Sequence, residues 1–355
     1  MKAIVHIGWP KTGSSAIQDF LRHNTDALAG RGVRYKRNEE RGSQLEYAAA
    51  IAGFERFASV PKLTRQRFRL NSAEEIDREH GKHLRALADY PKIYSEPQAV
   101  FSSEHIIVWV RKPEAIKAFD DHFSAIFDEV SYLAYMRDPL DVVPSEISER
   151  AKRGEPVRTQ KYVQQFVKQT DWGVMVRNWV NVVGKERFDL RRLDRSKLHG
   201  GDLITDFCQA VGVSHEGLKA PKFANESLTL PGILAMHDIA PMVQAVDVKN
   251  GRPDPDFKAL VKRVGELTAD GQKLRLTEKQ RTLVSEATAG WQEELRATFF
   301  PENAHLFAPK EIKERMRPKV AAKQAKAVVA QIEKELDAKA FGNLARIIPQ
   351  PPGQD

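Results

Sequence analysis

Short apolar runs alternate along the chain with longer segments whose apolar residues are three or four positions apart. The apolar runs, rich in β-branched and aromatic residues, predict strands at 3–7, 33–35, 99–104, 130–136 and 188–193. The wider spacing predicts helices at 44–57, 73–88 and 203–211, one or two helices at 162–183, a final helix with a closing turn at 291–307, and another helix that begins near Ser14. Strands that alternate with helices predict an α/β fold with a central, mainly parallel sheet flanked by helices.

The segment between the first strand and the first helix has the character of an anion-binding loop. Gly8 and Gly13 have the spacing of the glycines in a nucleotide-triphosphate loop, but the lysine stands before the second glycine, at Lys11, and not after it. Such a loop presents backbone N–H groups and the positive end of a helix to an anion. A lysine at this position suits a ligand with one 5′-phosphate and a transferable group beyond it. The alternative is a strand-to-helix turn that binds nothing.

Residues 10–15 (PKTGSS) resemble the 5′-phosphosulfate loop of the sulfotransferases that use 3′-phosphoadenosine 5′-phosphosulfate, and residues 6–24 resemble a bacterial branch of that superfamily. The resemblance implies a three-layer P-loop-like fold, this nucleotide as donor substrate, and no metal cofactor. It also implies that the loop binds the donor through Lys11, Thr12, Gly13, Ser14 and Ser15. Lys11 is the expected catalytic cation, because its charge would stabilise the oxygen that leaves sulfur.

The strand at 99–104 ends in polar residues, the last of which is Glu104. Ligands of parallel α/β sheets bind outside the carboxyl ends of the strands, so a carboxylate here is well placed for chemistry. The resembling enzymes use a glutamate or a histidine as the catalytic base, which makes Glu104 the first candidate and His105 the second. The plainer interpretation is that Glu104 caps the next helix or pairs with a lysine.

The strand at 130–136 is followed by Arg137, and Ser145 lies eight residues further on. Members of the resembling family have an arginine and a serine at this spacing, where they hold the 3′-phosphate of the donor. A guanidinium offers a planar fork to phosphate oxygens, which agrees with that role. Because Pro144 precedes Ser145, we expect the next helix to start at residue 143 or 144, with Ser145 in its first turn. The alternative for Arg137 is an ordinary ion pair with Asp138 or Asp141.

The overall composition narrows the class of protein. The chain has 355 residues, a net charge of +8 and a pI near 9.4, with basic residues dispersed along it. The one cysteine, Cys208, lies in a helical pattern and is expected in the core, as are Trp172 and Trp179. A single cysteine excludes an internal disulfide, and no apolar run approaches the ~18 residues of a membrane span. We expect a cytoplasmic protein.

The end of the chain differs from the rest. The resemblance covers residues 1–308, which are expected to form one sulfotransferase domain, and residues 225–228 (NESL) resemble a family segment near the nucleotide. Residues 309–355 are expected to form a basic helical extension with a disordered end. The apolar positions of that helix are Ala322, Ala325, Val329, Ile332 and Leu336. This helix either packs back on the domain, forms a homodimer contact, or makes a peripheral contact with a membrane enzyme.

Together these features predict a transferase that moves a sulfuryl group to an acceptor hydroxyl, with a carbohydrate or glycoconjugate as the expected acceptor. Three alternatives stay open. One is a P-loop kinase or NTPase, which the missing lysine after Gly13 disfavours. The second is a non-catalytic adaptor with a degenerate nucleotide fold. The third, a nucleic-acid binder, is the weakest because the charge is dispersed and no motif combines aromatic and basic residues.

Overall fold

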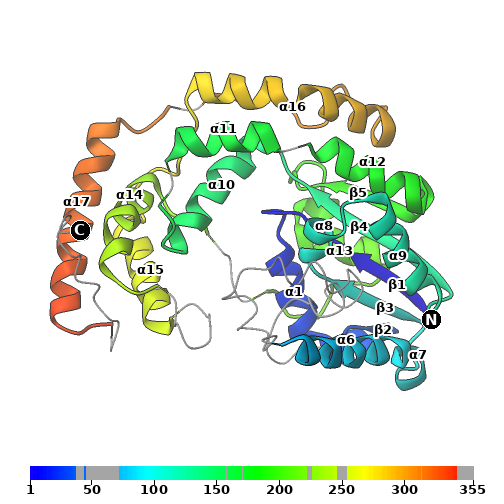
Figure 1. Cartoon of the computed structure of the whole chain (residues 1–355). Coiled ribbons are helices and arrows are strands. Elements are labelled where there is room, and N and C mark those ends of the chain that lie inside the picture. Colours follow the sequence, from blue (N-terminus) through cyan, green and yellow to red (C-terminus); the bar gives the residue numbers. More distant parts are fainter. Residues whose placement is uncertain are drawn as a thin grey trace.

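The computed structural model describes residues 1–36, 44, 72–156, 158–169, 171–221, 226–245, 254–312 and 314–341. Its centre is a five-stranded sheet in the order β2-β3-β1-β4-β5, with every neighbouring pair parallel (Figure 1). The strands are β1 (Lys2–His6), β2 (Val33–Arg34), β3 (Gln98–Ser102), β4 (Glu129–Met136) and β5 (Phe188–Arg192). The predicted α/β fold with a parallel sheet is therefore confirmed, and all five predicted strands are present to within two residues at either end.

Helices cover both faces of the sheet. Between β1 and β4 in the sequence, the helices are α1 (Ser14–His23), α2 (Thr25–Ala29), α6 (Ala73–Ala88), α7 (Tyr90–Ile93), α8 (His105–Trp109) and α9 (Pro113–Ser124). After β4 come α10 (Pro139–Lys152), α11 (Thr159–Gln169), α12 (Trp172–Val183), η1 (Lys185–Arg187), η2 (His199–Gly201) and α13 (Leu203–Val211). The last group is α14 (Leu230–Ile239), η3 (Ala240–Met242), α15 (Pro255–Leu267), α16 (Glu278–Phe299) and α17 (Pro318–Asp337). The helix predicted at 44–57 lies outside the described residues.

A separate hydrophobic core lies on each face of the sheet, because successive side chains of a strand point to opposite faces. Along β4, Tyr132, Ala134 and Met136 belong to the core shared with α9 and α12, whereas Leu133 and Tyr135 belong to the core shared with α1 and α13. Trp172 and Trp179 are buried in the first core and Cys208 in the second, as predicted. The sheet is thus the middle of three layers.

Helix α10 begins earlier than the sequence predicted. Asp138 caps it by accepting a hydrogen bond from the backbone N–H of Leu140 at 2.8 Å, and Pro139 occupies the first helical position. Pro144 therefore lies inside the helix, where it removes one intrahelical hydrogen bond. The expectation that Ser145 lies in the first turn is wrong: it is the seventh helical residue, so its backbone N–H belongs to the helical ladder and is not offered to a ligand.

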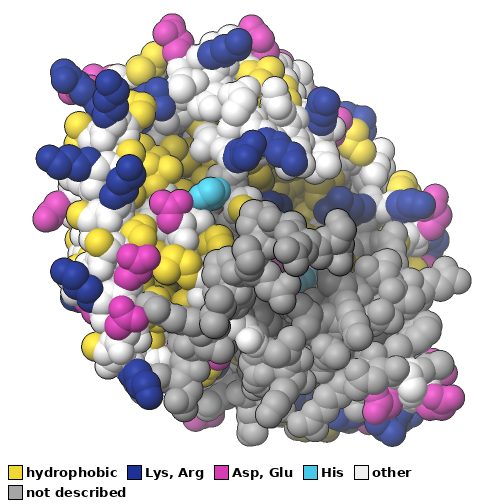
Figure 2. All heavy atoms as spheres, turned by 60° about the vertical axis from the view of Figure 1, so that its left-hand side comes forward, with side chains coloured by type: hydrophobic (Ala, Val, Ile, Leu, Met, Phe, Trp, Pro, Cys, Tyr) yellow, Lys and Arg dark blue, Asp and Glu magenta, His cyan; other side chains and the backbone are white. Residues whose placement is uncertain are grey.

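Helix α17 packs back on the protein, against α14 and α15 (Figure 1). Its buried positions are Ala321, Ala325, Val328, Ile332 and Leu336. The predicted stripe was wrong at two positions, since Ala322 is exposed and Val329 is half-buried. On the side of the molecule that carries α17, lysine and arginine side chains are interspersed with acidic and hydrophobic ones (Figure 2). The expected disordered end lies outside the described residues.

None of the helices in the described ranges is both long enough and apolar enough to cross a membrane.

Candidate functional site

The loop between β1 and α1 has a backbone that tolerates little substitution. Gly8, Lys11 and Gly13 have φ values of 63°, 61° and 87°. All three lie in the left-handed region, which is unfavourable for residues other than glycine. A Cβ atom on Gly8 would lie 2.5 Å from the Cα of Glu104, and one on Gly13 would lie 2.2 Å from the Cδ2 of Leu203. The two glycines therefore let the loop approach Glu104, two residues after β3, on one side and the start of α13 on the other.

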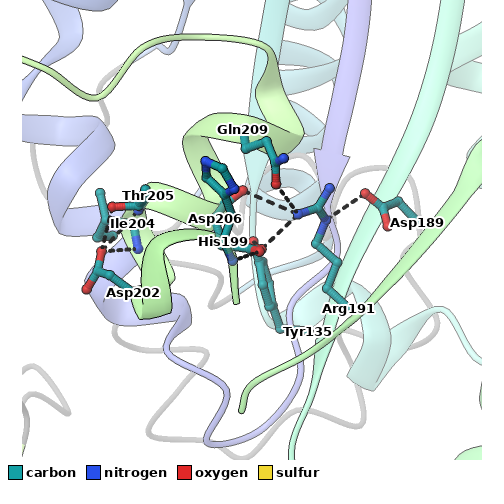
Figure 3. Close-up of polar contacts among 9 residues, drawn as sticks. All are labelled: Tyr135, Asp189, Arg191, His199, Asp202, Ile204, Thr205, Asp206 and Gln209. Carbon is teal, nitrogen blue, oxygen red and sulfur yellow. Dashed lines mark hydrogen bonds and ion pairs between the residues drawn. The ribbon is translucent and has the colours of Figure 1, made fainter. Parts of the chain in front are cut away.

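A buried carboxylate fixes α13 beside this loop (Figure 3). Asp206 accepts hydrogen bonds from the Tyr135 hydroxyl at 2.6 Å, from Nη1 of Arg191 at 2.9 Å and from the backbone N–H of His199 at 2.8 Å. These donors come from β4, β5 and the turn before α13, so a single side chain joins three elements. The start of the helix is closed by Asp202, which accepts from the N–H groups of Ile204 and Thr205.

The three loop hydroxyls differ in what they can offer to a ligand. Thr12 is fully buried, and its Oγ1 donates to the carbonyl of Trp9 at 2.8 Å, so this hydroxyl closes the loop upon itself. The Oγ of Ser14 is buried and has no hydrogen-bond partner within the described part of the chain. Ser15 is exposed on the first turn of α1. Ser14 and Ser15 are therefore the hydroxyls available at this helix start.

Lys11 is held at both its backbone and its side chain. Its carbonyl oxygen accepts a hydrogen bond from Nη1 of Arg137 at 3.2 Å, and its Nζ lies 3.2 Å from Oε2 of Glu149 on α10. The structure thus brings two predicted site residues, Lys11 and Arg137, into direct contact. It also adds an acidic residue, Glu149, that was not predicted.

Glu104 lies at the first position before α8, yet its side chain does not cap that helix. Instead, its Oε2 accepts a hydrogen bond from Nε2 of Gln18 at 2.8 Å, and its Oε1 is 3.8 Å from Nε2 of His105. The His105 ring stacks on Trp109 with 4.9 Å between ring centroids. Both base candidates therefore lie together beside Gly8, with about a third of each side chain exposed.

A buried histidine, His6, lies at the end of β1, close enough to Glu104 to feel its charge. Nδ1 of His6 is 2.9 Å from the Oγ of Ser102, while Nε2 has no hydrogen-bond partner among the described residues. Burial lowers the pKa of His6 to about 4, and the negative charge of Glu104 opposes this only in part. His6 is therefore neutral at pH 7 and adds no charge to the site.

Arg137 and Ser145 line one pocket of about 870 Å³. Its other basic residues are Arg195, Lys273, Arg275, Arg281 and Lys310, and its acidic residues are Asp141, Glu226 and Glu311. Lys310 forms ion pairs with Asp138, at 3.1 Å, and with Asp141; although burial opposes the charge, these carboxylates raise the pKa of the Lys310 ammonium. Arg137 also approaches Asp141, but at 3.9 Å this pair is long. A cavity with this excess of cations suits an anionic ligand.

The segment around residue 228 forms a wall of the same pocket. The backbone N–H of Leu228 donates to the buried Ser148 hydroxyl at 2.7 Å, which ties this segment to α10. Ser227 and Leu228, from the predicted nucleotide-side segment, both line the pocket, while Asn225 lies outside the described residues. In the part of the chain that the structure describes, no group of three or more His, Cys, Asp or Glu side chains could hold a metal ion.

Sequence reasoning assigned no role to Gln18 and Glu149. Glu149 lies four residues after Ser145, which places both on one face of α10, and this spacing was the available signal. Gln18 gave a weaker signal, because it reaches Glu104 only through the packing of α1 beside β3.

Comparisons with known proteins were made for the whole chain. No protein-family profile and no curated protein matches it. Solved structures similar to the chain include a sulfotransferase from Alicyclobacillus acidocaldarius, with a TM-score of 0.40 and 13% identity over 67% of this chain and 91% of that chain. They also include the sulfotransferase domain from the curacin biosynthetic pathway, with a TM-score of 0.39 and 13% identity over 81% of this chain and 97% of that chain. Both of these structures are sulfotransferases.

Proposed function

We propose that this protein transfers a sulfuryl group from 3′-phosphoadenosine 5′-phosphosulfate to the hydroxyl of an acceptor. The observation that carries the proposal is the contact of Arg137 with the Lys11 carbonyl, since it joins the loop predicted for the 5′-phosphosulfate to the pocket predicted for the 3′-phosphate. A nucleotide that bears phosphate at both ends of its ribose needs two such anion sites side by side.

The residues present fit this donor. In the loop, the backbone N–H groups of residues 13–15 and the hydroxyls of Ser14 and Ser15 would hold the 5′-phosphate, while the N–H of Thr12 donates to the Trp9 carbonyl at 3.4 Å. In the pocket, Arg137 and Ser145 would hold the 3′-phosphate, with the charge of Lys310 nearby. Selection of this nucleotide over ADP or ATP would then come from Arg137.

The proposed chemistry is an in-line displacement at sulfur. The acceptor oxygen forms a bond to sulfur while the bond from sulfur to the bridging oxygen of the donor breaks. Glu104 takes the acceptor proton, and Lys11 stabilises the negative charge that develops on the departing phosphate oxygen. The products are a sulfate ester and 3′-phosphoadenosine 5′-phosphate. Gln18, by holding Oε2 of Glu104 at 2.8 Å, orients the base.

The acceptor class and the setting are also part of the proposal. The resemblance of residues 6–24 to a bacterial branch and the glutamate at position 104 favour a carbohydrate or glycoconjugate hydroxyl. The single cysteine, Cys208, is in keeping with a cytoplasmic reaction. We assign the transfer to residues 1–308 and treat residues 309–355 as an extension whose helix α17 packs on α14 and α15. The exposed, lysine-bearing side of α17 would be left for contact with a second molecule.

The test is sulfuryl transfer itself. Purified protein is incubated with the donor and a panel of carbohydrate, phenol and amine acceptors, and both the sulfated acceptor and 3′-phosphoadenosine 5′-phosphate are quantified. We expect the two products in equal amounts, and their loss in Lys11→Ala. Phosphoryl transfer from ATP with Mg²⁺ in place of sulfuryl transfer would support the kinase alternative. Absence of both reactions across the panel would support the adaptor alternative.

A further inference from the structure

An ion pair joins Lys11 of the loop to Glu149 of α10. Nζ of Lys11 and Oε2 of Glu149 are 3.2 Å apart, and only 19% and 25% of the two side chains are exposed. Water therefore screens this pair less than it screens an ion pair on the open surface. The carboxylate of Glu149 is therefore paired with the same Lys11 ammonium group that the proposed reaction needs for the donor.

Contacts hold Lys11 at both its backbone and its side chain. Lys11 has a φ of 61°, which is uncommon for a residue with a side chain and persists only where contacts impose it. Its carbonyl accepts a hydrogen bond from Arg137, in the turn between β4 and α10, and its Nζ pairs with Glu149 near the end of α10. Lys11 is therefore held by two neighbouring parts of the chain, the turn after β4 and helix α10.

Glu149 keeps its negative charge in this position. Burial opposes ionisation, but the charges of Lys11 and Lys152 outweigh it and hold the pKa of the Glu149 carboxyl below its usual range. The Nζ atom of Lys152, on the following turn of the helix, lies 4.0 Å from Oε2 of Glu149. The neighbouring Glu146 behaves differently, because burial outweighs the nearby cations and raises the pKa of its carboxyl. The ion pair of Lys11 is with Glu149.

We propose that Glu149 is a positioning residue that directs Lys11 toward α10 and competes with the donor for its ammonium group. This inference rests on the proposed function. Binding of the 5′-phosphosulfate draws Nζ away from Glu149 and onto the donor, and release of the product returns it. Glu149 thereby weakens the binding of donor and product alike, which favours product release.

The experiment measures the dissociation constants of 3′-phosphoadenosine 5′-phosphate and of inorganic phosphate for four proteins: wild type, Glu149→Gln, Lys11→Ala and the double variant. The neutral amide should free Lys11, so Glu149→Gln should bind the nucleotide about three- to tenfold more tightly than wild type. In the Lys11→Ala background the same change should give no gain, because the competing ammonium is absent. Thermal unfolding of each variant confirms that it is folded.

Glu155→Gln is the matched control. It removes a carboxylate from the segment after α10 that pairs with Arg153 at 3.0 Å and does not contact Lys11. A general effect of lost negative charge would appear in this variant too and would overturn the proposal. So would weaker or unchanged binding in Glu149→Gln, or an equal gain in both backgrounds.

The two probes, the nucleotide and inorganic phosphate, distinguish a failure of this proposal from a failure of the proposed donor. If wild type binds phosphate but shows no preference for the nucleotide, the donor assignment fails, and the phosphate series still decides the role of Glu149. If wild type binds neither probe, both proposals fail.

Discussion

Arg137 donates a hydrogen bond from Nη1 to the backbone carbonyl of Lys11 at 3.2 Å. The contact joins the end of β4 to the loop after β1, two neighbouring strands of the sheet. Because both strands are parallel, their carboxyl ends meet at the same edge, where ligands of α/β proteins bind. A ligand that engages the guanidinium group of Arg137 is therefore also placed beside the loop.

Gly8→Ala is expected to destabilise the protein and to displace Glu104. The added Cβ atom would lie 2.5 Å from the Cα of Glu104, and the φ of 63° is itself unfavourable for alanine. Together these effects should lower the free energy of unfolding by about 3 kcal/mol or more. Denaturant unfolding measures the change. Gly212→Ala is the matched control. Gly212 has a φ of 74°, and no atom of the described residues lies within 4 Å of an added Cβ, so only the backbone cost of about 1 kcal/mol should remain. Equal losses in the two variants would contradict the close approach at Gly8.

Glu104→Gln is expected to leave nucleotide binding intact and to lower turnover by about 10²- to 10⁴-fold, the range for loss of a general base. The amide is nearly the same size as the carboxylate but cannot take the acceptor proton. Steady-state rates with an active acceptor, together with the dissociation constant of 3′-phosphoadenosine 5′-phosphate, check this expectation. Glu114→Gln, at an exposed position in α9, should change neither quantity. Unchanged turnover in Glu104→Gln would move the assignment to His105.

His6 should make the protein less stable in mild acid. The unfolded chain binds a proton on this imidazole below about pH 6.5, whereas the folded protein does so only below about pH 4. The stability contributed by neutral His6 is therefore complete above pH 6.5 and is lost as the pH falls from 6.5 to 4, by up to about 1.4 kcal/mol per pH unit. Urea unfolding at several pH values should show a shallower dependence for His6→Gln. The exposed His215→Gln should follow wild type. If His6→Gln follows wild type as well, His6 is not held neutral by burial.

Ile332→Ala should reveal that α17 is part of the folded domain. Ile332 is fully buried, and truncation of a buried isoleucine costs about 2–5 kcal/mol. Val329→Ala, at a half-buried position one turn earlier, should cost less than about 1 kcal/mol. Denaturant unfolding compares the two variants. A larger effect at Val329 would contradict the observed packing of α17, in which Ile332 is fully buried and Val329 only half-buried.

The strands and the loop were predictable because their signals are local. Alternation along 130–136 determines which side chain faces which layer, and the glycines at 8 and 13 are required by the backbone of the loop itself. The start of α10 was missed for a local reason as well. Two prolines compete for the first helical position, and the cap provided by Asp138 favours Pro139 over Pro144.

The partners of the site residues were not predictable in the same way. Lys11 and Glu149 are separated by 138 residues, and Gln18 and Glu104 by 86, so no periodicity links either pair. The register of α17 also depends on its partner: a spacing of three and four fits both Ala322 with Val329 and Ala321 with Val328. Packing against α14 selects the second set.

The most direct measurement is an equilibrium titration of the wild-type protein with 3′-phosphoadenosine 5′-phosphate, ADP and ATP with Mg²⁺, repeated with Arg137→Ala. We expect the 3′-phosphorylated nucleotide to bind about 10- to 100-fold more tightly than ADP, and this preference to disappear in Arg137→Ala. Arg177→Ala, which removes an arginine paired with Glu294 outside the pocket, should keep the preference. If ATP with Mg²⁺ binds as tightly as the 3′-phosphorylated nucleotide, or if the preference survives in Arg137→Ala, the proposed donor is wrong.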